Sequence, residues 1–254
     1  MRLFALSDLH VDFEANARWV AALSRSDYRQ DVLILAGDLT DSLAQLQWCL
    51  EQLAQRFRKV FFVPGNHDLW VARDAASVTS LDKFAAVMRA AEDSGAMLRA
   101  EVVEGVAIVP LLGWYDGSFG APGPALRDAW MDFHACRWPE GWADVDIADY
   151  FLGRNVLPER LGGDLTLSFS HFLPRIDVMP AYIPPGKRML YPVLGSARIE
   201  QLVRAIGSDI HVYGHSHVNR DVQIDGVRYV NNAFGYPHET RITSKTLRVI
   251  HSTA

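Results

Sequence analysis

Acidic, amide and imidazole side chains occur in short groups along this sequence, and metal ions are their common chemical partner. The first group is an Asp-x-His motif at residues 8–10, the second a Gly-Asp pair at 37–38, and the third a Gly-Asn-His-Asp motif at 65–68. A lone His171 and a Gly-His-x-His motif at 214–217 follow. Oxygen and nitrogen ligands without thiolate suit transition metals rather than a structural, cysteine-rich zinc site. These groups hold at least seven candidate ligands, which is too many for one ion and enough for two ions that share a bridging ligand.

Each of the first three groups directly follows a short apolar run that is typical of a buried β-strand. These runs cover 2–7, 32–36 and 60–63, and helical spacing of apolar residues lies between and after them, at 43–57 and 81–91. The alternation predicts a parallel sheet with helices on its faces. Because the carboxyl ends of parallel strands lie at one edge of a sheet, the three groups are expected to converge on one crevice.

The second half of the sequence is richer in predicted strands. Candidate strands cover 102–112, as two runs joined near Glu104-Gly105, and 165–169, 211–213, 222–224, 227–230 and 246–250. The pair Asp225-Gly226 predicts a tight hairpin turn, and a serine-capped helix is expected at about 196–206.

The two later histidine groups also stand at strand ends. His171 follows the strand predicted at 165–169, and the motif at 214–217 follows the strand predicted at 211–213. Residues two apart in an extended chain point to the same side. We therefore expect Asp8 with His10, and His215 with His217, to face one cavity.

Residues 113–160 are rich in tryptophan and lack clear periodicity. They contain four tryptophans and several glycine, proline and aspartate residues. Long irregular segments inside a compact domain are often functional, so one interpretation is a rim or lid over the site. The other interpretation is aromatic packing over the core. We find no linker or repeat in the sequence, and we expect one domain over residues 1–254.

The composition is that of an ordinary globular protein, with 49% apolar and 22% charged residues. The formal net charge of −5 does not favour nucleic acid or an anionic membrane as a partner. Cys49 and Cys136 form no Cys-x-x-Cys motif, which favours a reducing compartment. We find neither a signal-peptide pattern nor an apolar stretch long enough to span a bilayer, so a cytoplasmic location is expected.

Taken in order, the five groups resemble the calcineurin-like metallophosphoesterase family over residues 8–217. The resemblance implies an α/β fold, a four-layer α-β-β-α sandwich of two mixed sheets flanked by helices. It implies that Asp8, His10 and His217 hold a first metal ion, that Asn66, His171 and His215 hold a second, and that Asp38 bridges both. It also implies that His67 faces the leaving-group oxygen. Asp41 is the expected acidic partner of His67, and Asp68 is the competing candidate.

The activity implied by the resemblance is hydrolysis of a phosphoester. Two ions (Mn, Fe, Zn or Co, with the identity open) would hold a bridging hydroxide that attacks phosphorus in line, and His67 would protonate or stabilise the departing oxygen. The expected substrate is a small-molecule phosphodiester or phosphomonoester, because the chain is acidic and has no basic tract. A metal-dependent nuclease with a basic groove beside the metals is the first alternative. A non-catalytic scaffold is the second, although such a protein should have lost ligands or His67.

The remaining histidines and several basic and aromatic residues have simpler interpretations. His134, His211, His238 and His251 match no metal group, although His238 could line the rim of the site. Arg73, Arg175, Lys187 and Arg188 are candidates for binding a substrate phosphate, but solvated surface positions are the simpler expectation. Trp70, Trp114 and Tyr115 either stack on an aromatic leaving group or belong to the core.

Overall fold

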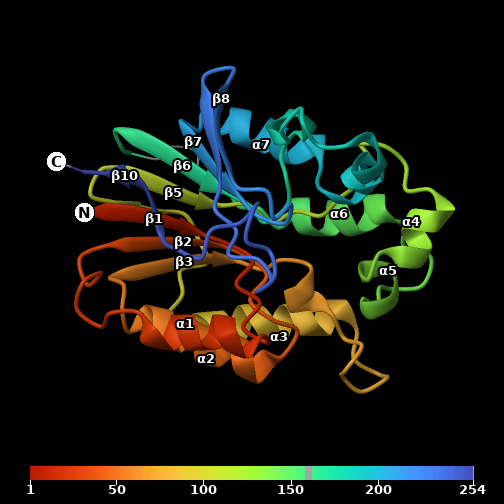
Figure 1. Cartoon of the computed structure of the whole chain (residues 1–254), viewed down its shortest axis with the longest axis horizontal. Helices are drawn as coiled ribbons and strands as arrows, with labels where there is room; N and C mark the ends of the chain where they lie inside the picture. Colours follow the sequence, from red (N-terminus) through yellow and green to blue (C-terminus); the bar gives the residue numbers. More distant parts are fainter. Residues whose placement is uncertain (158–161, 254) are drawn as a thin grey trace.

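Two β-sheets packed face to face form the centre of the computed structural model, which describes residues 1–157 and 162–253 (Figure 1). The strands are β1 Arg2–Leu6, β2 Val32–Ala36, β3 Lys59–Val63, β4 Glu101–Val103, β5 Val106–Pro110, β6 Leu165–Phe169, β7 Ile210–Tyr213, β8 Arg220–Ile224, β9 Val227–Asn231 and β10 Arg248–Ser252. The first sheet has the order β10-β1-β2-β3, and the second has the order β4-β5-β6-β7-β9-β8. Parallel strands form the middle of each sheet, and β10, β4 and β8 pair antiparallel at the edges.

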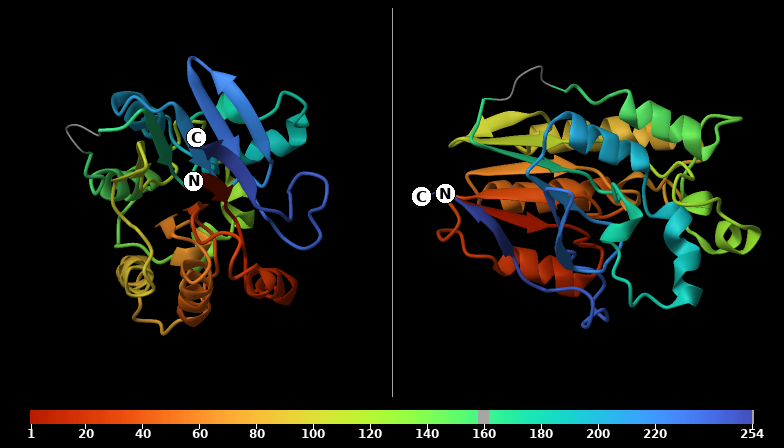
Figure 2. Two further views of the ribbon diagram at one scale, coloured as in Figure 1. Left: turned by 90° about the vertical axis from the view of Figure 1, so that its left-hand side faces the viewer. Right: turned by 90° about the horizontal axis from the view of Figure 1, so that it is seen from above.

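Helices cover the outer face of both sheets. The α-helices are α1 Glu14–Ala22, α2 Leu43–Ala54, α3 Ser80–Asp93, α4 Pro124–Ala129, α5 Asp132–Ala135, α6 Asp144–Leu152 and α7 Ala197–Ala205, and the 3-10 segments are η1 His67–Leu69, η2 Ile176–Val178 and η3 Pro185–Val193. Helices α1 to α3 lie under the first sheet, and α6 and α7 lie over the second (Figures 1 and 2). This arrangement confirms the predicted four-layer α-β-β-α sandwich of two mixed sheets. Within the described ranges, none of the helices has the length and apolar composition needed to cross a bilayer.

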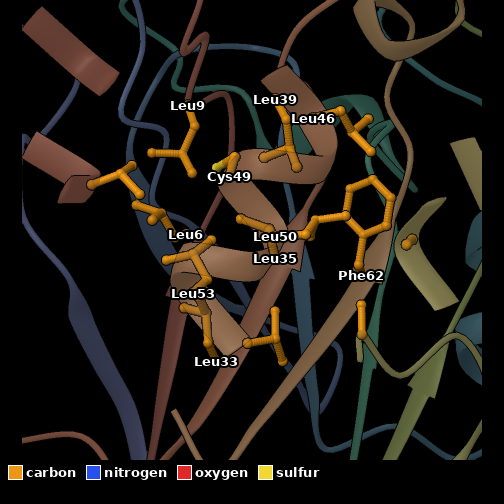
Figure 3. Close-up of a cluster of buried hydrophobic side chains, with 14 of the residues drawn as sticks. Leu6, Leu9, Leu33, Leu35, Leu39, Leu46, Cys49, Leu50, Leu53 and Phe62 are labelled. Carbon is orange, nitrogen blue, oxygen red and sulfur yellow. The ribbon is translucent and has the colours of Figure 1, made fainter. Parts of the chain in front are cut away.

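The apolar strand β2 shows why the sandwich has two cores. All five of its residues are buried. Leu33 and Leu35 point toward the helical layer, where they pack with α2 (Figure 3). Val32, Ile34 and Ala36 point the other way and pack between the sheets. Because side chains alternate along a strand, an unbroken apolar run fits a position buried on both faces.

The predicted elements before residue 112 and after residue 164 are present with small shifts at their ends. Both predicted turns are confirmed, since Glu104-Gly105 and Asp225-Gly226 each have two successive residues with positive φ. The helices α4 to α6 and the segment η3 were not predicted. They are short or rich in tryptophan and proline, and their helical form depends on packing against the second sheet rather than on local periodicity. Residues 158–160, the end of the tryptophan-rich segment, lie outside the described residues.

His211 in β7 provides a test of the core through the pH dependence of stability. Its ring is fully buried, with Nδ1 2.7 Å from the Ser168 hydroxyl and Nε2 3.0 Å from the Ser170 hydroxyl. Burial lowers the pKa of His211 to about 3, whereas a histidine in the unfolded chain has a pKa of about 6.5. The unfolded state therefore binds this proton first, so the contribution of neutral His211 is complete above pH ~6.5 and is lost as the pH falls toward 3.

We predict that the stability advantage of the wild type over His211→Gln shrinks by about 2 kcal/mol between pH 7 and pH 5. Urea denaturation of both metal-free proteins at several pH values measures this difference. Val212→Ala in the same strand serves as the control, because it removes no titratable group and its cost in stability should not change with pH. A pH-independent difference for His211→Gln would contradict the prediction.

Candidate metal centre

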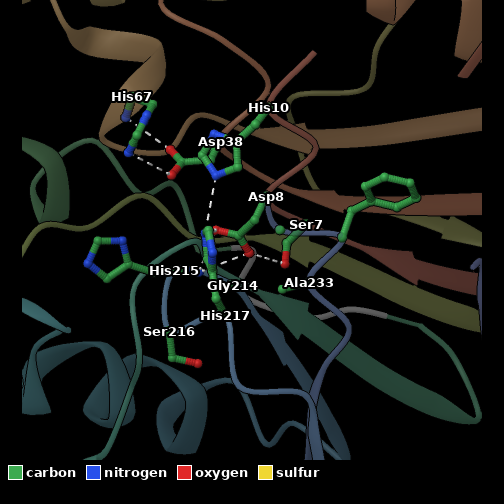
Figure 4. Close-up of polar contacts among 12 residues, drawn as sticks. Ser7, Asp8, His10, Asp38, His67, Gly214, His215, Ser216, His217 and Ala233 are labelled. Atoms are coloured by element: carbon green, nitrogen blue, oxygen red, sulfur yellow. Dashed lines mark hydrogen bonds and ion pairs between the residues drawn. The ribbon is translucent and has the colours of Figure 1, made fainter. Parts of the chain in front are cut away.

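All seven predicted ligands meet at the carboxyl ends of strands from both sheets, as the strand-end argument predicted. Three overlapping groups of side chains have ligand atoms within 4.8 Å of one another. They are Asp8, His10 and His217; His10, Asp38 and His67; and Asp38, His171 and His215. Asn66 joins the third group through its Oδ1, which lies 3.0 Å from His171 Nε2. Figure 4 shows the side chains of Asp8, His10, Asp38 and His67 directed toward the same space.

The distances between ligand atoms fit a shell of nitrogen and oxygen donors around cations. On one side His217 Nε2 lies 3.1 Å from His10 Nε2 and 3.2 Å from Asp8 Oδ1. On the other side His171 Nε2 lies 3.1 Å from His215 Nδ1 and 3.5 Å from Asp38 Oδ1. Ligands about 2.1 Å from a transition metal are about 3 Å apart when they meet at a right angle. The donor set present in this chain is therefore compatible with two neighbouring cation subsites.

The protonation states of His171 and His215 also fit a cation site. Burial lowers the pKa of His171 to about 3 and that of His215 to about 4, which leaves both rings neutral, the form that binds metals. Burial, reinforced by the nearby carboxylate of Asp8, raises the pKa of Asp38 well above its usual value. Burial alone would also raise the pKa of Asp8, but the adjacent His217 lowers it. A cation between these carboxylates would stabilise both in the ionised form.

The backbone at the site is left-handed rather than extended. Asp8, His10, Asp38, His215 and His217 have φ values of 54°, 42°, 58°, 66° and 51°. The prediction that residues two apart point to the same side assumed an extended chain, and this assumption was wrong. Asp8 and His10 still meet, but His215 and His217 point into different groups. Left-handed backbone costs about 1–2 kcal/mol at each residue other than glycine, and such strain persists where surrounding contacts hold it.

Two acidic side chains hold these loops by accepting hydrogen bonds from backbone N–H groups. Both carboxylate oxygens of Asp8 accept from the backbone N–H of His215, at 3.0 and 3.2 Å. The fully buried Asp68 accepts from four backbone N–H groups, those of Asp38, Leu39, Thr40 and Gly65. Asp68 is thus engaged with the backbone rather than with His67.

His67 packs against aromatic rings at the entrance to the site. Its ring stacks on Trp70 with 3.6 Å between centroids, and its Nε2 lies 3.8 Å from Asp38 Oδ2. No hydrogen bond within the described ranges joins His67 to Asp41. Instead Asp41 Oδ2 pairs with Arg73 Nε at 3.2 Å. The expected pairing of Asp41 with His67 is therefore not found in this arrangement.

The other aromatic and basic candidates divide clearly. Trp114 and Tyr115 are core residues, only 1% and 2% exposed. Trp70 is half-buried, and its ring stacks on that of His67. Arg175 forms ion pairs with Asp177, Glu200 and Asp225, and Arg188 donates to the backbone carbonyls of Ala181 and Ile183. These two arginines are engaged within the protein.

Three residues at the site were missed from the sequence. Asp132 is buried and bonds to Asn66, Glu239 bonds to His217, and the ring of Tyr236 lies 4.5 Å from that of His10. Asp132 stands among irregularly spaced aromatic residues and belongs to no motif. The only signal for the other two was their position beside His238, in a loop that could line the rim.

A comparison of the sequence with models of protein families identifies the family of this chain. Residues 1–219 match the model of the calcineurin-like phosphoesterase family. This chain belongs to that family. The match confirms the resemblance drawn from the sequence motifs, and it makes the chain a phosphoric ester hydrolase of a metal-dependent family.

The most informative relative comes from Mycobacterium tuberculosis (strain ATCC 25618 / H37Rv). This chain is 27% identical over 264 residues to its [acyl-carrier-protein] phosphodiesterase PptH, covering 94% of this chain and 79% of the relative. The crystal structure of phosphopantetheinyl hydrolase (PptH) from Mycobacterium tuberculosis aligns with a TM-score of 0.78 at 25% identity, covering 98% of this chain and 95% of that one. A putative 5′-nucleotidase from Staphylococcus aureus aligns at 13% identity over 91% of this chain and 48% of that one, with a TM-score of 0.40, too low to support any argument.

The close contact between Gly65 and Asp38 generates a prediction. A Cβ atom at residue 65 would lie 2.1 Å from Asp38 Oδ1 and 2.7 Å from His171 Cε1. We predict that Gly65→Ala displaces both side chains, destabilises the protein by about 1–3 kcal/mol and reduces bound metal. Elemental analysis and urea denaturation measure the two effects. Gly186→Ala is the matched control, because a Cβ atom there meets nothing within 4 Å. Full metal content in Gly65→Ala would contradict the role given to this glycine.

Proposed function

We propose that this enzyme hydrolyses the phosphodiester bond that joins a phosphopantetheinyl group to an acyl carrier protein. The observation that carries the proposal is the likeness to PptH, which extends over nearly the whole of both folded chains. The match includes the parts of the chain beyond residue 219, where the family model ends. A protein-bound phosphodiester thus replaces the small-molecule phosphoester as the favoured substrate.

The proposal assigns the ligands to two cation subsites. Asp8, His10 and His217 form one subsite, Asn66, His171 and His215 form the other, and Asp38 lies between them. When bound, the ions supply charge stabilisation for the phosphoryl oxygens and an activated water. Imidazoles bind metals in their neutral form, so two carboxylates and two divalent ions would leave a net positive charge, which suits an anionic phosphodiester.

His67 is proposed to act on the leaving group. Burial, reinforced by neighbouring histidines, lowers the pKa of His67 well below 6.5, so its ring is neutral in this environment and carries one N–H donor. Stacking on Trp70 and the backbone bond from His67 N to Asp38 Oδ1 hold the ring beside the ligand groups. An N–H directed at the departing oxygen stabilises its developing charge. A catalytic role for Asp41 remains a prediction without a contact that supports it.

The arrangement of basic side chains near the site favours this substrate over nucleic acid. A nuclease would need lysine or arginine side chains beside the metals that are free to bind the phosphates of a nucleic-acid backbone. Among the described residues near the site, Arg73 is paired with Asp41, and the Lys245 ammonium donates to the carbonyls of Phe234, Gly235 and Tyr236. The scaffold alternative is not favoured either, since the chain retains each motif and the side chains of these residues lie close together.

Two substitutions test the assigned roles. We predict that Asp38→Asn abolishes turnover and weakens metal binding, because this carboxylate serves both subsites. We predict that His67→Ala lowers kcat by about 10²–10⁴-fold while bound metal is retained. Steady-state kinetics on an aryl phosphodiester, with metal analysis of each variant, separates the two effects. His251→Ala is the control, and wild-type turnover in either test variant would contradict the assignment.

The substrate itself is tested by direct comparison. We expect a purified carrier protein bearing phosphopantetheine to lose that group when enzyme and Mn²⁺ are added, with kcat/KM at least about tenfold higher than for a small aryl phosphodiester. Intact-protein mass spectrometry follows the loss. Phosphomonoesters and a single-stranded oligonucleotide complete the panel. Faster cleavage of the oligonucleotide, or no release from the carrier protein, would overturn the proposed substrate.

A further inference from the structure

A buried carboxylate in the tryptophan-rich segment contacts the outer side of a predicted metal ligand, Asn66. Asp132, at the start of α5, is 2% exposed and accepts hydrogen bonds from three nitrogen donors. Its Oδ1 accepts from the Asn66 amide at 2.8 Å and from the Trp70 indole at 2.7 Å. Its Oδ2 accepts from the Trp130 indole at 2.8 Å. Every one of these partners is a donor, so only a group with two acceptor oxygens satisfies all of them.

These bonds decide which atom of Asn66 faces the site. With its Nδ2 donating to Asp132, the amide turns its Oδ1 toward His171 Nε2, 3.0 Å away. An amide turned the other way would present an NH₂ group, which cannot bind a cation. The same carboxylate holds Trp70, whose ring stacks on His67. One buried side chain therefore orients both a candidate ligand and the support of the proposed leaving-group histidine.

Glu239 makes a comparable contact with a residue of the group formed by Asp8, His10 and His217. Its Oε2 lies 2.7 Å from His217 Nδ1 and also accepts from the Tyr236 backbone N–H at 2.8 Å. With Nδ1 held by Glu239, Nε2 is the ring atom that faces His10 and Asp8, and a cation bound there would take the place of the Nε2 proton. Carboxylates placed behind ligand histidines fix the tautomer and the ring orientation in this way. Glu239 lies beyond residue 219, outside the part of the chain that the family model covers.

We propose that Asp132 and Glu239 are positioning residues, each of which prepares one cation subsite. Asp132 orients the subsite of Asn66, His171 and His215, and Glu239 orients the subsite of Asp8, His10 and His217. The inference rests on the two-subsite part of the proposed function and is independent of the carrier-protein substrate. On this proposal, the role of the tryptophan-rich segment is to position Asp132 next to Asn66.

The test measures Mn²⁺ affinity by calorimetry in proteins that keep one subsite each. His10→Ala removes a ligand of the first subsite, and His171→Ala removes a ligand of the second. In the His10→Ala background we expect Asp132→Asn to weaken Mn²⁺ binding by at least about tenfold and Glu239→Ala to leave it unchanged. In the His171→Ala background we expect the reverse.

A rescue variant separates positioning from simple packing. In Asp132→Asn the new NH₂ group faces a donor whichever way it turns. Adding Trp130→Phe removes the indole N–H opposite Oδ2, so the new amide keeps its oxygen toward Asn66 and Trp70. We expect the double variant Trp130→Phe/Asp132→Asn to recover most of the Mn²⁺ affinity, and Trp130→Phe alone to bind Mn²⁺ as the wild type does.

Each contrary outcome counts against a definite part of the inference. Equal losses in both backgrounds, no loss for Asp132→Asn, or unfolding of both Asp132→Asn and the double variant by near-UV circular dichroism would overturn the positioning role. If His10→Ala and His171→Ala do not each retain one ion, the two-subsite assignment fails and the inference fails with it. Failure on the carrier protein with these affinities as expected would overturn only the substrate.

Discussion

The four backbone hydrogen bonds accepted by Asp68 are the constraint on which the metal centre depends. They join the loop after β2, which carries Asp38, to the turn after β3, which carries Asn66 and His67. Burial raises the pKa of Asp68 to about 6 although the four N–H groups lower it, so the carboxylate is largely ionised at neutral pH. Hydrogen bonds to a charged group contribute about 1.5–3 kcal/mol each, enough to offset the left-handed backbone of Asp38.

The second requirement is the stacking of the two sheets. The first sheet supplies Asp8, Asp38 and Asn66, and the second supplies the late histidines from the loops after β6 and β7. Contacts between these loops are direct: His171 Nδ1 lies 2.8 Å from the Ala36 carbonyl oxygen, and the His215 N–H donates to Asp8. Neither sheet could form the centre alone, so the apolar layer between them positions the chemistry as well as stabilising the fold.

Support for the ligands comes from segments that look least regular in the sequence. The aromatic cluster of the tryptophan-rich segment packs on the second sheet and brings Asp132 against Asn66. The loop after β9 brings Glu239 against His217 and places Tyr236 beside His10. Each of these residues contacts the side chain of a predicted ligand. Outer carboxylates that hold metal ligands in place commonly affect metal affinity nearly as much as the ligands do.

Local patterns in the sequence were enough to predict the strands, the ligand groups at their ends and the family. An apolar run followed by acidic or imidazole residues occupies consecutive positions and can be recognised in the sequence. The order of the five groups can likewise be read without any knowledge of packing. The pairing of Asp132 with Asn66, the left-handed backbone of His215 and His217, and the engagement of Asp41 with Arg73 were decided only by the tertiary structure. Each depends on a left-handed turn or on a contact between distant segments, and a single buried hydrogen bond leaves no periodic trace in the chain.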